Sequence, residues 1–200
     1  MKNAIKYSKK GIVMVTLFTT LLSFANENSF FNIKNDAKKT ALTLKSVKEG
    51  NQLSIIDNNG IILYREIIEK TGNYNKEFNL TSLPDGAYIF ELDKDLEINT
   101  IPFNIKSNIV LFEKEKEKTI FKPLIRVKED IVYVSKLSFN EQPLKIEIYF
   151  TGSNGSELMF TETIENTKVI ERIFKLDGLK FGSYKLVFHG EGREFIKYVN

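Results

Sequence analysis

The chain has 200 residues, of which 29 are basic and 26 are acidic. The first 25 residues contain four lysines and no acidic residue, so the remaining 175 carry 25 basic against 26 acidic groups, a net charge of −1. That balance argues against nucleic-acid binding, which depends on a basic surface. With 42% hydrophobic and 28% charged residues, the composition is that of a folded chain and not of a disordered one.

Residues 1–25 are typical of a signal peptide. Four lysines precede an apolar stretch of eleven residues at 12–22, and Ser23 and Ala25 place small side chains before a cleavage point at Asn26. A buried helix or a membrane anchor is the alternative, but the stretch is shorter than the roughly 20 residues that span a bilayer. We therefore predict an exported protein, located in the periplasm, at the cell surface or outside the cell, with no membrane span in the mature chain.

The rest of the chain repeats itself. Residues 78–92 align with residues 174–188 at an offset of 96 without a gap, and Phe, two Leu, Gly and Tyr coincide. Residues 42–47 align with 132–137 at an offset of 90, and both copies contain an Asn-Gly pair, at 59–60 and 154–155. We predict two copies, at 26–112 and 113–200, joined by a charged linker at 113–118.

Each copy is predicted to form about seven short strands. In the second copy they lie near 121–127, 131–139, 144–151, 157–164, 169–176, 183–189 and 193–199, and apolar residues alternate with polar ones as in half-buried strands. The two Asn-Gly pairs predict type I′ hairpin turns, in which both central residues have positive φ. The sequence therefore predicts an all-β protein of two tandem Ig-like Greek-key β-sandwiches.

A tyrosine corner is expected in each copy. Tyr88 and Tyr184 stand where the sixth strand of an Ig-like sandwich begins, and the tyrosine there hydrogen-bonds back to the preceding corner. Gly86 and Gly182 precede them by two residues, and we expect these glycines to allow a tight turn. The absence of cysteine excludes disulfides, so the 16 Phe and 8 Tyr must supply the buried surface.

Two sequence blocks carry a family resemblance. Residues 53–64 place Asp-Asn-Asn-Gly between hydrophobic strands, residues 83–88 read Leu-Pro-Asp-Gly-Ala-Tyr, and residues 194–199 form a short basic and hydrophobic end. Together they resemble the C-terminal sorting domain of type IX secretion substrates, although its opening Asn-Pro and its large passenger are not found. The resemblance implies an Ig-like sandwich, as a stand-alone relative with a sorting role or as the same fold without one. The matched positions are Gly60, Leu83, Pro84, Gly86, Tyr88, Gly155, Leu179, Gly182, Tyr184 and Lys197.

Few residues suit catalysis or metal binding. The single histidine, His189, precedes a predicted hairpin turn and is expected to be a surface residue, and the sequence has no cysteine to act as a nucleophile or zinc ligand. Residues 57–60 lack the alternating oxygen ligands of a calcium loop, and no phosphate-binding glycine loop is present. We therefore expect no enzyme, no catalytic residue, no metal and no cofactor. A hydrolase with an unrecognised carboxylate pair among the 26 acidic residues is the last alternative.

The candidate functional residues are those of interaction surfaces. Ile61, Leu63 and Ile67 form an apolar stripe that needs a cover, which could be residues 30–33, the second copy or a partner protein. Tyr149 and Tyr198 are predicted to face outward and could stack on sugars. We therefore expect a protein that binds another protein or a cell-envelope component, and the family resemblance implies a link to type IX secretion. A glycan-binding module is the alternative.

Overall fold

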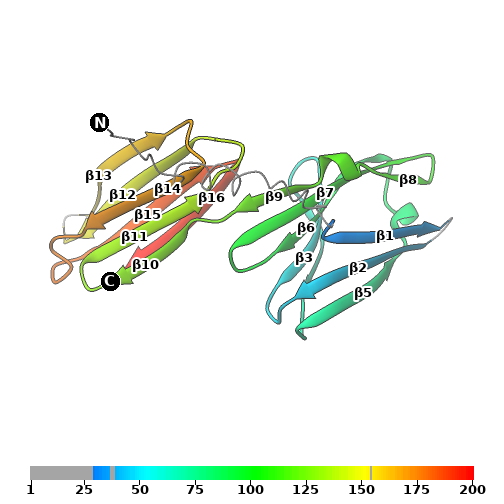
Figure 1. Cartoon of the computed structure of the whole chain (residues 1–200), viewed down its shortest axis with the longest axis horizontal. Helices are drawn as coiled ribbons and strands as arrows, with labels where there is room; N and C mark the ends of the chain where they lie inside the picture. The colour runs from blue at the N-terminus through cyan, green and yellow to red at the C-terminus, as the bar shows by residue number, and fades with distance from the viewer. Residues whose placement is uncertain (1–28, 37–38, 154) are drawn as a thin grey trace, which may run out of the picture.

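The computed structural model describes residues 29–36, 39–153 and 155–200, so the predicted signal peptide at 1–25 lies outside the described residues. Sixteen strands make up most of the described chain, and its helical elements are two short 3-10 turns, η1 (Leu80–Ser82) and η2 (Lys114–Lys116). The predicted all-β class is confirmed. We call residues 29–121 the first half and residues 124–200 the second half, which lie side by side in Figure 1.

The first half is a sandwich of two antiparallel sheets. The smaller sheet has the order β1-β2-β5, and the larger sheet has the order β4-β3-β6-β7-β8, with β9 also paired to β7. These strands are β1 (Phe31–Asp36), β2 (Lys39–Val47), β3 (Gln52–Asp57), β4 (Ile62–Ile67), β5 (Gly72–Phe78), β6 (Gly86–Asp93), β7 (Glu97–Lys106), β8 (Ile109–Phe112) and β9 (Lys118–Phe121).

The second half has the corresponding topology. Its sheets have the orders β10-β11-β14 and β13-β12-β15-β16, which match β1-β2-β5 and β4-β3-β6-β7 strand for strand. In both halves the chain leaves the smaller sheet for two strands and then returns to it, which is a Greek-key path. The strands are β10 (Leu124–Lys128), β11 (Ile131–Leu137), β12 (Leu144–Gly152), β13 (Gly155–Ile164), β14 (Val169–Lys175), β15 (Ser183–Gly190) and β16 (Arg193–Val199).

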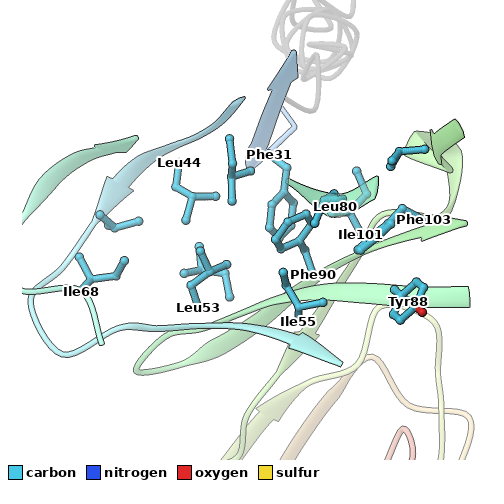
Figure 2. Packing of buried hydrophobic residues seen from close by; sticks show 14 of the residues in the cluster. Phe31, Leu44, Leu53, Ile55, Ile68, Leu80, Tyr88, Phe90, Ile101 and Phe103 are labelled. Carbon is cyan, nitrogen blue, oxygen red and sulfur yellow. The ribbon is translucent and has the colours of Figure 1, made fainter. Parts of the chain in front are cut away.

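Each half has its own hydrophobic core between its two sheets. In the first half Phe31 and Leu44 of the smaller sheet face Leu53, Ile55 and Phe90 of the larger one (Figure 2). The buried cluster of the second half shares no residue with that of the first. Alternation of buried and exposed residues along the strands therefore stabilises two separate sandwiches, without disulfides.

Two contacts between the layers recur at an offset of 96. In each half the outer strand of the larger sheet touches the following strand, in the other sheet, through an edge-to-face pair of rings and through an ion pair. The ring pairs are Tyr64–Phe78 and Phe160–Phe174, with centroids 5.2 and 5.3 Å apart, and the ion pairs are Glu66–Lys76 and Glu162–Arg172.

The register corrects one part of the sequence alignment. Leu42 lies opposite Lys76, and Val134 lies opposite Arg172, its counterpart at the offset of 96. The equivalent of Leu42 is thus Val134, at an offset of 92, and the predicted match with Val132 is wrong. A shift of two residues leaves every side chain on the same face of a strand, so the hydrophobic pattern alone could not detect the error.

The hairpin at residues 57–62 forms as expected, but its turn type differs from the prediction. Gly60 has a φ of +81°, whereas Asn59 does not have a positive φ, so the turn is not type I′. The Asp57 carboxylate accepts hydrogen bonds from the backbone N–H groups of Asn59 and Ile61, at 2.9 and 2.8 Å. The aspartate thus closes the turn, and only Gly60 needs the left-handed conformation. Residue 154, in the other predicted Asn-Gly turn, lies outside the described residues.

Both tyrosine corners are present. The Tyr88 hydroxyl donates to the carbonyl of Pro84 at 2.7 Å, and the Tyr184 hydroxyl donates to the carbonyl of Asp177 at 2.5 Å. Leu83 and Leu179 pack beside them against their respective cores.

The proposed role of the corner glycines is wrong, because neither of them has a positive φ. A Cβ on Gly182 would lie 2.3 Å from the backbone oxygen of Thr151, so this glycine is needed for close packing. A Cβ on Gly86 would meet nothing closer than the Tyr88 hydroxyl at 3.5 Å, so an alanine fits there.

Candidate interaction surfaces

An apolar row crosses four strands on the outer face of the larger sheet of the first half. Ile56 of β3 lies opposite Ile62 of the edge strand β4 on one side and opposite Ile89 of β6 on the other. Ile89 in turn lies opposite Pro102 of β7. A bulge in β4 brings Leu63 to the same end of the row. We call Ile62, Leu63, Ile56, Ile89 and Pro102 the apolar row.

The predicted stripe on β4 is exposed and has no cover among the described residues. The exposed fractions of Ile61, Leu63 and Ile67 are 58%, 44% and 61%. Residues 30–33 cannot cover them, because β1 pairs with β2 in the smaller sheet, where Phe31 is 1% exposed and belongs to the core. That proposed cover is therefore wrong, and the exposed fractions show that the second half does not cover the stripe either.

The second half carries an equivalent row with different chemistry. Leu158 of β13, Tyr149 of β12, Lys185 of β15 and Tyr198 of β16 lie opposite one another in that order. The Lys185 ammonium lies over the Tyr149 ring, 5.2 Å from its centroid, and Tyr198 is 62% exposed. The structure therefore places Tyr149 and Tyr198 in one row, two strand spacings or about 10 Å apart. We call these four residues the tyrosine row.

A polar cluster borders the tyrosine row. Glu147 accepts a hydrogen bond from the Tyr149 hydroxyl at 3.1 Å, pairs with Lys145 at 2.5 Å, and lies 3.2 Å from Nε2 of His189. The Lys145 ammonium is the main cause that lowers the pKa of Glu147 to about 2, and His189 and Tyr149 act in the same direction. A carboxylate held ionised in this way is poorly suited to general acid or base catalysis near neutral pH.

The motif residues that the sequence singled out are spread over both halves. Gly60 lies in the β3–β4 turn, and Gly155 begins β13 with a φ of +108°. Lys197 lies on the last strand, β16, opposite Leu186. The corner residues Leu83, Pro84, Tyr88, Leu179 and Tyr184 stabilise the two sandwiches, so the structure brings these positions together only within each corner.

A groove between the two halves was not anticipated from the sequence. Its volume is about 740 Å³, and Phe121 and Phe139 meet in it with ring centroids 5.4 Å apart. Beside it, Arg193 of the β15–β16 hairpin pairs with Glu91, whose side chain is almost buried. The sequence contains no indication of these contacts, because the two partners of each pair belong to different halves.

The predicted linker at 113–118 contributes to the wall of this groove. It contains η2 and the first residue of β9. Glu117 accepts hydrogen bonds from the Ser29 hydroxyl at 2.5 Å and from the backbone N–H of Phe30 at 2.8 Å. This carboxylate therefore ties the start of the described chain to the junction between the halves.

The described residues contain neither a metal-binding cluster nor a membrane-spanning helix. In residues 29–36, 39–153 and 155–200, no group of three or more His, Cys, Asp or Glu side chains is arranged to hold a metal ion. In the same part of the chain, no helix has the length and apolar character needed to cross a bilayer.

Comparisons with known proteins give no family. No protein-family model and no curated protein sequence matches the chain. Among solved structures, the BSP domain of a biofilm-associated protein aligns at 13% identity and a TM-score of 0.26, over 84% of this chain and 28% of that one. The human OSCAR ligand-binding domain aligns at 6% identity and a TM-score of 0.25, over 85% and 96% of the two chains. Likeness at this level carries no argument about function.

Proposed function

We propose that this chain is an exported, non-enzymatic interaction protein that binds a protein or cell-envelope component through the apolar row and the neighbouring stripe on β4. The observation that carries the proposal is the exposure of Leu63 and Ile67 beside a row that is apolar across four strands. Contiguous apolar surface on a soluble domain is typical of a binding site. The partner would meet a preformed sheet face, so binding would need no bond chemistry.

The test compares two arginine substitutions on opposite edges of the same sheet. Leu63→Arg places a charge at the end of the apolar row, whereas Leu111→Arg places one on β8, where the side chain is 60% exposed and outside the row. Immobilised parent and variants are incubated with a cell-envelope extract, and captured proteins are identified by mass spectrometry. We expect Leu63→Arg to lose captured partners that Leu111→Arg retains. A folded Leu63→Arg variant with the capture profile of the parent would leave the row without a role.

We also propose a link to type IX secretion, as a sorting-domain-like protein. Its support is the resemblance of residues 53–64, 83–88 and 194–199, together with the corner geometry at Tyr88. Cells are fractionated into periplasm, outer membrane and medium, and both termini are mapped by mass spectrometry. Loss of the C-terminal segment from the protein in the medium supports a sorting role. A full-length C-terminus confined to the periplasm contradicts it.

Glycan binding is the second candidate, and the tyrosine row favours it. Two tyrosines about 10 Å apart on one face, with Lys185 between them, offer stacking surfaces and a hydrogen-bond donor. A glycan array is probed with the parent, with Tyr149→Ala and Tyr198→Ala, and with Tyr133→Ala on the opposite sheet as a control. Retained sugar binding in both row variants would show that the sugar binds elsewhere.

A further inference from the structure

Each sheet ends in edge strands that have a free side, among them β4 in the first half and β14 in the second. Strand β4 pairs only with β3, and β14 pairs only with β11, among the strands of the described chain. The backbone N–H and C=O groups on their other sides therefore have no strand partner there. Such an edge is a template on which another strand can add.

The outer faces of these two strands have complementary patterns. On β4 the outward residues are Leu63, Arg65 and Ile67, alternating with the inward Tyr64 and Glu66. On β14 they are Val169, Glu171 and Ile173, followed by Lys175 at the end of the strand, and the exposed fractions of Val169 and Ile173 are 55% and 68%. Over three successive outward positions, 63–67 on β4 and 169–173 on β14, both faces thus read apolar, charged, apolar, and their central charges are opposite in sign.

The two central charges, Arg65 and Glu171, have no ion-pair partner among the described residues. Glu66 and Arg172, their neighbours in sequence, pair with Lys76 and Glu162 across the layers. In the part of the chain that the structure covers, neither the Arg65 guanidinium nor the Glu171 carboxylate takes part in an ion pair. A partner strand that brings these two groups together would supply the missing counter-charge for both.

We propose that copies of this chain associate head to tail, with β4 of one copy added to β14 of the next. In an antiparallel register Leu63 lies opposite Ile173, Arg65 opposite Glu171, and Ile67 opposite Val169. The same central pair forms in a parallel register, because the pattern is symmetric about the charge. Two β4 strands pairing about their centres would instead place Arg65 against Arg65, and like charges directly opposite are destabilising.

Such an association is heterologous, because two different surfaces of the chain meet. Unless the rotation between copies closes a ring, it continues as an open array. One added strand of six or seven residues makes a small contact, so the association is expected to be weak and to depend on concentration. The inference rests on the proposed function in one respect, since Leu63 and Ile67 belong to the surface proposed there.

Complementary charge reversals test this pairing. The mature chain and its Arg65→Glu and Glu171→Arg variants are examined by sedimentation velocity from about 10 µM to 1 mM, the range in which weak interfaces associate. Lys34→Glu, a charge reversal on the outward face of the edge strand β1, serves as the matched control. Each reversal places like charges opposite one another and is expected to weaken association by about five- to tenfold.

An equimolar mixture of the two variants gives the deciding result. In the mixture, Glu at position 65 of one variant meets Arg at position 171 of the other, and the native Arg65 of the second meets the native Glu171 of the first. We expect the mixture to associate as the parent does, although each variant alone does not. Circular dichroism serves to check that both variants fold, and we expect them to do so because both positions are exposed.

Three outcomes would overturn the proposal. The parent could stay monomeric over the whole range, or both reversals could associate like the parent and the control, or the mixture could stay as weak as its components. If the parent is monomeric, self-association is refuted, but the proposed binding of an envelope partner is not, because the capture experiment with Leu63→Arg tests that binding separately. Conversely, the parent could assemble, lose assembly on Arg65→Glu, and capture no envelope partner. That combination would refute the proposed partner binding and support self-association.

Discussion

Removal of one hydroxyl group tests the corner that begins β6. Tyr88 is 6% exposed, and its hydroxyl donates to the carbonyl of Pro84, an exposed residue. Tyr88→Phe deletes the donor and leaves the ring in place. Loss of a buried hydrogen bond of this kind costs about 1–2 kcal/mol, and access of water to the Pro84 carbonyl places the effect toward the lower end.

The same reasoning applies to Tyr184, which is 8% exposed and donates to the carbonyl of Asp177. For a unit of 60–100 residues, 1 kcal/mol lowers the melting temperature by roughly 4–8 °C. Because the two cores share no residue, Tyr88→Phe is expected to lower the unfolding transition of the first half, and Tyr184→Phe that of the second.

Thermal and urea unfolding followed by circular dichroism measure the effect. Tyr198→Phe is the control, since Tyr198 is largely exposed and its hydroxyl has no hydrogen-bond partner in the described chain. Unfolding of both corner variants at the midpoint of the parent would refute the corner reasoning. A shift of equal size in the Tyr198→Phe control would show that the assay does not report on the corner.

Three further predictions concern packing, the junction between the halves and acid stability. Gly182→Ala forces a Cβ against a backbone oxygen, so it is expected to lower the free energy of unfolding in urea by about 1–3 kcal/mol. Gly86→Ala is expected to leave that free energy within about 0.5 kcal/mol of the parent, and equal effects of the two variants would contradict the packing argument. Arg193→Ala leaves the nearly buried Glu91 carboxylate without its cation, so the halves are expected to loosen, and an unchanged small-angle scattering profile would contradict this. The pKa of Glu147 is lowered from 4.5 to about 2 in the folded protein, so the contribution of this carboxylate to stability is complete above about pH 4.5 and is lost as the pH falls toward 2. An NMR titration of the Glu147 carboxyl with a midpoint near 4.5 would contradict this prediction.

The sequence predicted well those features that depend on a repeating pattern. Alternation of apolar and polar residues located the strands of the second half within a few residues, and the spacing of Gly and Tyr located both corners. The function of Gly182 was not accessible in this way, because the contact that requires it comes from Thr151, about thirty residues earlier in the chain. The turn at Gly60 differed for a local reason, since hydrogen bonds from the Asp57 side chain favoured another turn type.

The candidate surfaces were predicted less completely, because a surface depends on which strands become neighbours. Exposure of Leu63 and Tyr198 followed from alternation, but Ile89 and Pro102 joined the apolar row only through strand pairing. Arg193 and Glu91 are 102 residues apart and have no shared motif, so nothing in the sequence links them.

The equivalent rows in the two halves show how one fold can carry two surfaces. Residues between the sheets are constrained in both halves by the same ring contacts and tyrosine corners, so they can change little without loss of packing. The outer face has no such constraint, and at equivalent places Ile89 in one half corresponds to Lys185 in the other, and Pro102 to Tyr198. If the two rows bind different partners, Leu63→Arg should impair only capture of envelope proteins and Tyr198→Ala only binding of glycans. Loss of both activities in either variant would instead indicate a single composite site.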